Sequence, residues 1–154
     1  AGGAQGVIAC QGGNMAGWSL YIDEGGRPTY HYNWFGHVHS VLADSEQLRA
    51  GRHEVVVNFA YDGGFGAGGT ATLLVDGRTA GSMRIEKTVP LVYSMSGETF
   101  DIGVDTGSPV GNYPHLFTCT ADIIGVTIER LDEPSAATKQ KMREGEFRAS
   151  ISTQ

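Results

Sequence analysis

Two aspartates and a threonine lie close together in the last third of the chain, within the segment Phe100-Asp-Ile-Gly-Val-Asp-Thr-Gly-Ser-Pro109. Carboxylate and hydroxyl oxygens at Asp101, Asp105 and Thr106 are donors of the kind that Ca²⁺ prefers, supplied here by a loop that contains glycine. The same side chains also suit an ordinary turn, in which they accept hydrogen bonds from backbone amides. Both interpretations stay open for this segment, and Ca²⁺ is the one metal that these residues suggest.

A stripe of aromatic residues provides the second candidate binding site. Tyr30, Tyr32 and Trp34 alternate with His31 and Asn33, so a strand here would place the three rings on one face. On an exposed concave face such rings stack on sugars, whereas between two sheets they form part of a core. We favour the core and keep glycan binding as the alternative.

No catalytic set is evident. A glycosidase on a sandwich fold needs two suitably spaced carboxylates, and neither an E-x-D-x-x-E run nor a G-x-S-x-G nucleophile motif is present. The glycines of 64–69 match the G-x-G-x-x-G pattern, but β-type residues follow at once where a dinucleotide site needs a helix. His37 and His39 are taken as ordinary histidines. We therefore predict no catalytic residue and no resident metal in this chain.

The composition narrows the classes of partner. A net charge of −6 in 154 residues disfavours nucleic acid, and no apolar run approaches the ~20 residues of a membrane span. Two cysteines, Cys10 and Cys119, are either a disulfide between the ends of the β region or two small buried residues. We expect neither a nucleic acid nor a membrane as partner.

Short alternating segments with turns between them predict an all-β protein, an antiparallel β-sandwich. Asp76-Gly77 predicts a tight hairpin turn, because both residues tolerate positive φ. Residues 1–133 form the expected sandwich domain, which lacks a first strand if the chain begins inside a domain, and 134–154 a short helical or flexible C-terminal tail. The expected strands are 7–11, 18–23, 27–35, 37–43, 53–61, 70–75, 78–84, 100–105 and 119–131.

Read as a whole, the order of motifs over residues 6 to 130 resembles the C-terminal region of the long bacterial arylsulfatases. The matching segments are Gln11-Gly-Gly13, Gly17-Trp-Ser-Leu-Tyr21, Tyr30-His-Tyr-Asn-Trp-Phe-Gly36, Phe59-Ala-Tyr-Asp-Gly-Gly64, Gly68-Gly-Thr-Ala-Thr-Leu-Leu-Val-Asp-Gly77, Ile85-Glu-Lys-Thr-Val-Pro90, Phe100-Asp-Ile-Gly-Val-Asp-Thr-Gly-Ser-Pro-Val110 and Phe117-Thr-Cys-Thr120. The resemblance implies a concanavalin A-like jelly roll attached to a sulfate-ester hydrolase.

That family's catalytic domain uses Ca²⁺ and a formylglycine made from Cys or Ser in a C/S-x-P-x-R context. Neither Cys10 nor Cys119 has that context, so no catalytic residue carries over. The resemblance implies a non-catalytic accessory module whose partner is the sulfatase catalytic domain or another copy of the chain, in the bacterial cytoplasm or periplasm. The alternative is a lectin-like carbohydrate-binding module that uses Tyr30, Tyr32 and Trp34.

Overall fold

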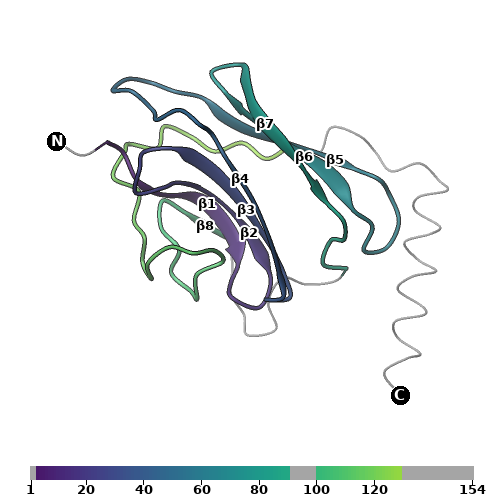
Figure 1. Cartoon of the computed structure of the whole chain (residues 1–154). Coiled ribbons are helices and arrows are strands. Elements are labelled where there is room, and N and C mark those ends of the chain that lie inside the picture. The colour runs from purple at the N-terminus through teal and green to yellow at the C-terminus, as the bar shows by residue number, and fades with distance from the viewer. Residues whose placement is uncertain (1–2, 91–99, 130–154) are drawn as a thin grey trace.

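The computed structural model describes residues 3–90 and 100–129, which form two antiparallel β-sheets packed as layers (Figure 1). One sheet has five strands in the order β4-β3-β2-β1-β8, and the other has three in the order β5-β6-β7. The strands are β1 Gly6–Gly12, β2 Gly17–Ile22, β3 Pro28–Trp34, β4 Val38–Ala43, β5 Val55–Tyr61, β6 Gly69–Val75, β7 Arg78–Ile85 and β8 Phe100–Ile102. The expected all-β, sandwich-like architecture is confirmed, and no helix occurs within the described ranges.

Short turns join four consecutive strands of the five-stranded sheet. Pro28 opens β3, and the first residue of a strand is one of the few positions in a sheet that suit proline. The β3–β4 turn contains Phe35 and Gly36, both with positive φ. The last strand, β8, pairs with β1 so that Asp101 lies opposite Cys10. The two ends of the described β region therefore meet at one edge of this sheet.

The three-stranded sheet is the meander that its turn residues predict. Asp76 and Gly77 have φ values of 51° and 76°, as a type I′ turn between β6 and β7 requires. The glycine loop between β5 and β6 leads into a strand and not into a helix, as the β-type residues after it predict. Gly63 and Gly64 both have positive φ there, which only glycine adopts without strain.

The core between the sheets is built from alternate residues of each strand. Tyr30 and Tyr32 from β3 pack with Ala71 and Ile85 of the other sheet. Partly buried apolar residues complete this inner core: Trp18, Leu20, Trp34, Val57, Met83 and Val89. The aromatic stripe predicted from the sequence therefore lies mainly in the core.

A second core covers the outer face of the five-stranded sheet, the face directed away from β5–β7. The polypeptide after β8 folds back over this face, and we call residues 103–118 the outer loop (Figure 1). Its Val110, Tyr113 and Phe117 pack on Val7 and Tyr21 of the sheet. The Val7 amide donates to the Phe117 carbonyl at 2.9 Å and fixes one end of the outer loop.

One predicted strand is absent. The expectation of a last strand at 119–131 is wrong for residues 119–129, which form no strand. Ile124 and Ile128 are 74% and 67% exposed. Their β-branched side chains favour a strand, but propensity alone cannot form one without a neighbouring strand to pair with.

Two further expectations have different outcomes. Cys10 and Cys119 are both free thiols, the first buried and the second half-buried, so no disulfide joins them. The expected helix within 134–154 lies outside the described residues and stays a prediction.

Candidate functional site

The structure brings Cys10 next to two of the aspartates singled out by sequence. The Cys10 sulfur and one carboxylate oxygen each from Asp101 and Asp105 lie within 4.8 Å of one another. We call these three residues the thiol–carboxylate cluster; among residues 3–90 and 100–129 no other group of three possible metal ligands lies as close. The pairing of β1 with β8 places Cys10 beside Asp101, and the outer loop supplies Asp105.

Asp105 is held firmly beneath the outer loop. It is 2% exposed, and its Oδ2 accepts hydrogen bonds from the Tyr113 hydroxyl at 2.7 Å and the Val110 amide at 3.3 Å. Both donors belong to the outer loop, so the carboxylate also shapes the loop that buries it. A buried carboxylate with two donors is oriented, but its charge is not cancelled.

Asp101 and Thr106 form a turn of their own. The Asp101 Oδ2 atom accepts from the Thr106 amide at 2.8 Å and from the Thr106 hydroxyl at 2.6 Å. This is the amide-capping arrangement that the sequence allowed as one interpretation. Thr106 is thus a donor to Asp101, while the binding of Ca²⁺ by these residues stays a prediction.

The electrostatics of the cluster are unbalanced. No Lys, Arg or His of the described chain forms an ion pair with Asp101 or Asp105, and the two carboxylates lie close together. Burial, together with the negative charges of Asp105 and Asp101, raises the pKa of Cys10 to about 12. The thiol is therefore protonated at neutral pH, and the two carboxylates have no cationic side chain of the described chain beside them.

Two more polar side chains, Ser19 and His31, lie in a row with Cys10 on the outer face of the sheet. Cys10 pairs with Ser19, and Ser19 pairs with His31, so all three project from the same face of the sheet. Ser19 is fully buried, and its hydroxyl lies near that of Tyr113 without forming a hydrogen bond of acceptable geometry. A buried hydroxyl without a partner is uncommon, and here it lies beside the cluster.

His31 stands at the far end of this row. Its Nε2 lies 2.8 Å from the Nδ1 of His39, while its buried Nδ1 has no partner. Burial lowers the pKa of His31 to about 4, so its imidazole is neutral at pH 7. Gly111 of the outer loop covers the ring so closely that a Cβ at this position would lie 2.6 Å from Nδ1.

The structure places the aromatic stripe away from the cluster, on the inner face of the sheet. Tyr30 and Tyr32 are only 7% and 3% exposed, so a sugar ring has no open face to stack on at either residue. Trp34 is half-buried and has the Lys87 ammonium 5.7 Å from its ring centroid. The six candidate binding residues thus divide into a mainly core group and a group at the outer loop.

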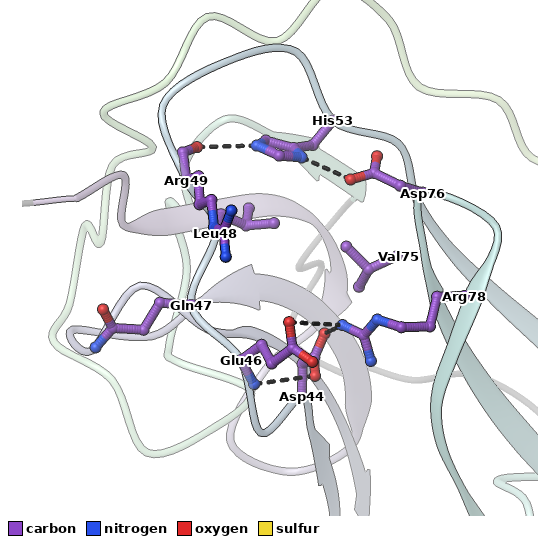
Figure 2. A pocket seen from close by; sticks show the side chains of 9 residues that line it. All are labelled: Asp44, Glu46, Gln47, Leu48, Arg49, His53, Val75, Asp76 and Arg78. Carbon is purple, nitrogen blue, oxygen red and sulfur yellow. Dashed lines mark hydrogen bonds and ion pairs between the residues drawn. The ribbon is translucent and has the colours of Figure 1, made fainter.

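A polar cleft of about 190 Å³ lies beside the β6–β7 turn (Figure 2). In this cleft His53 Nδ1 lies 2.7 Å from Asp76 Oδ2, and its Nε2 lies 2.8 Å from the Arg49 carbonyl. Arg78 meets the buried carboxylate of Asp44 at 2.6 Å. Figure 2 shows these groups joined in pairs along the lining of the cleft.

The hydrogen bonds of His53 determine its chemistry. A carboxylate and a carbonyl are both acceptors, so the imidazole satisfies both when it carries protons on both nitrogens. Hydrogen bonds to Asp76 and Arg49 accordingly raise the pKa of His53. A histidine occupied on both sides has no free nitrogen to act as a base, so this cleft is a structural junction between the 44–54 segment and the β6–β7 turn.

Three residues around the cluster carry no sequence signal for a site: Cys10, Ser19 and Tyr113. Each lies in an unremarkable local context, and only the pairing of strands distant in sequence joins them to Asp105. The sequence does indicate which face of its strand Cys10 occupies. This information becomes useful only once β8 is known to be the neighbour of β1.

Comparison with known protein families, curated proteins and solved structures finds no match to this chain. Within the described ranges, no helix has the length and apolar character needed to cross a bilayer.

Proposed function

We propose that this chain is a non-catalytic accessory module of a sulfate-ester hydrolase, a concanavalin A-like jelly roll that packs on the catalytic domain. The resemblance to arylsulfatase C-terminal regions suggests the class of enzyme. One structural observation supports a packing function: apolar side chains that project between the sheets remain exposed along one side of the sandwich.

The strand register shows that these side chains belong to the inner faces. Phe59 pairs with the fully buried Ala71, and Ile102 pairs with Ala9, which is 2% exposed. Directly paired residues project from the same face of a sheet. Yet Phe59 is 38% and Ile102 50% exposed, so each sheet leaves part of the other's inner face uncovered.

Further apolar residues extend this exposed set. Phe100, whose ring lies 6.0 Å from that of Trp18, is 39% exposed, and Tyr61 on β5 is 42% exposed. The exposed apolar residues on the inner faces of β5 and β8 therefore mark a candidate interaction surface.

The edge of the three-stranded sheet offers backbone groups as well. Within the described part of the chain, β5 pairs only with β6, so half of its amides and carbonyls face away from the sheet. A strand from a companion domain added at this edge would satisfy those groups and cover Phe59 and Tyr61.

The first test is intact-mass measurement and N-terminal sequencing of every polypeptide that co-purifies with the chain from its native source. A covalently or non-covalently associated polypeptide with a C/S-x-P-x-R motif supports the proposal. A lone chain, or one whose partner lacks that motif, overturns it. A doubled mass by light scattering would instead identify a second copy as the partner.

A pair of variants then tests the proposed surface in the purified complex of this chain with its partner. Ile102→Thr on the inner face should weaken association, because it removes exposed apolar area from the interface. Val41→Thr is the matched control: Val41 is 51% exposed but pairs with His31 on the outer face. Equal association of the two variants would place the interface elsewhere.

A further inference from the structure

The thiol–carboxylate cluster has the composition of a metal site, and it contains no positively charged side chain. Asp105 is almost fully buried, Asp101 lies close to it, and no cationic side chain of the described chain pairs with either. Buried carboxylates in proteins are normally paired with a cation or bound to a metal. The cluster therefore has the electrostatic character of a cation site.

The donor atoms indicate which cation the cluster would bind. Ca²⁺ and Mg²⁺ take oxygen ligands and avoid sulfur, whereas Zn²⁺ accepts thiolate and carboxylate together at about 2.3 Å and 2.0–2.2 Å. Cys10 supplies sulfur, and Asp101 and Asp105 supply oxygen. Three protein ligands leave a fourth position of a tetrahedral ion for water, which can enter beside the half-buried Asp101.

The buried hydroxyl of Ser19 is a second indication that the cluster binds an ion. Its hydroxyl is fully buried, unpartnered and directly across the strand pair from Cys10. If Cys10 coordinates an ion it carries a thiolate, and the Ser19 O–H then has an acceptor beside it. Hydrogen bonds of this kind to a ligand atom orient it and strengthen metal binding.

We propose that Cys10, Asp101 and Asp105 bind a divalent transition-metal ion, Zn²⁺ in the first instance, with Ser19 as the supporting donor to the Cys10 sulfur. Coordination releases the thiol proton to solvent, and the bound ion supplies positive charge between the two carboxylates. Because Asp105 also accepts from Tyr113 and Val110, the bound ion fastens the outer loop to β1 and to the edge strand β8.

The test uses the whole chain, freed of metal with a chelator and titrated first with Co²⁺. A thiolate bound to Co²⁺ gives an intense near-ultraviolet charge-transfer band, and Zn²⁺ should bleach it by displacement. Zn²⁺ should also raise the melting temperature. A folded wild-type chain with neither the band nor a thermal shift overturns the proposal, whatever the variants do.

Matched cysteine variants locate the site. Cys10→Ala should abolish the Co²⁺ band, while Cys119→Ala, which removes the other free thiol, should retain it. The opposite result overturns the assignment. Since Cys10 is buried, circular dichroism must show that its variant is folded; Asp101→Asn, at a half-buried position, provides a second variant in which the band should be lost or strongly weakened.

Ser19→Ala tests the supporting donor. It keeps all three ligands and should weaken Zn²⁺ affinity by about 10- to 100-fold without removing the Co²⁺ band. Unchanged affinity in this variant would contradict the part assigned to Ser19. Titration with Ca²⁺ distinguishes the donor set, because a Ca²⁺ response without any response to Zn²⁺ would refute sulfur coordination.

Discussion

Gly111→Ala is the most direct test of how the outer loop packs on the sheet. Gly111 lies over the His31 ring, and an added Cβ would lie 2.6 Å from Nδ1 and 3.1 Å from both Cγ and Cε1. The ring has little freedom to retreat, because it is 1% exposed and its Nε2 engages His39. Either the outer loop rises or the histidine pair separates.

The expected cost follows from these contacts. Inserting one methyl group into a packed site costs about 1–3 kcal/mol. Loss of the His31–His39 hydrogen bond would add about 1 kcal/mol. Replacing glycine by alanine offsets roughly 0.4–1 kcal/mol by restricting the unfolded chain. We therefore expect Gly111→Ala to lower the free energy of unfolding by about 1–3 kcal/mol.

Gly125→Ala is the matched control. A Cβ at Gly125 meets nothing within 4 Å, and neither glycine has positive φ, so only the effect on the unfolded chain remains. This control should be as stable as wild type or slightly more so. Urea unfolding followed by tryptophan fluorescence measures both variants. Equal stability of the two would refute close packing of the outer loop on His31.

Three further predictions concern the core and the titration of two histidines. Leu73→Ala on the central strand β6 should cost about 2–5 kcal/mol in thermal or urea unfolding, because Leu73 is fully buried, and Leu74→Ala on the opposite face should cost less. The stability of the wild type should fall by on the order of 3 kcal/mol between pH 6.5 and about pH 4, because the unfolded chain takes up a proton that buried His31 does not; urea midpoints of His31→Gln should show a smaller fall. The pKa of His53 is raised in the folded chain, so its contribution is complete below pH 6.5 and is lost as the pH rises through the folded value. The stability difference between wild type and His53→Gln should therefore shrink at high pH, and a constant difference would contradict the ion pair with Asp76.

Local signals predicted most of the strands but not their partners. Asp76-Gly77 encodes a hairpin turn in two residues, and the structure has the positive φ values that the pair predicts. The segment around Ile124 carries an equally clear β-pattern yet forms no strand within 119–129, because a strand also requires a neighbour. Side-chain pattern determines which residues favour extended structure, and long-range pairing determines which of them form a sheet.

The candidate site shows the same division. Asp101 and Asp105 attract notice from sequence because their spacing suits a ligand loop or a capped turn. Cys10 does not, since its proximity depends on strands β1 and β8 meeting across most of the domain. The burial of Tyr30 and Tyr32 follows from the sandwich itself, once the second sheet is in place.

The pairing of β1 with β8 also has a consequence for how the chain folds. Strands β1 to β4 follow one another through short turns, so they can assemble from local contacts as soon as they are made. β8 must return across about ninety residues to reach β1, and closing so long a loop is entropically unfavourable and slow. We therefore expect Cys10 to meet Asp101 and Asp105 only in the last stage of folding, so the rate at which the cluster appears would report completion of the whole domain.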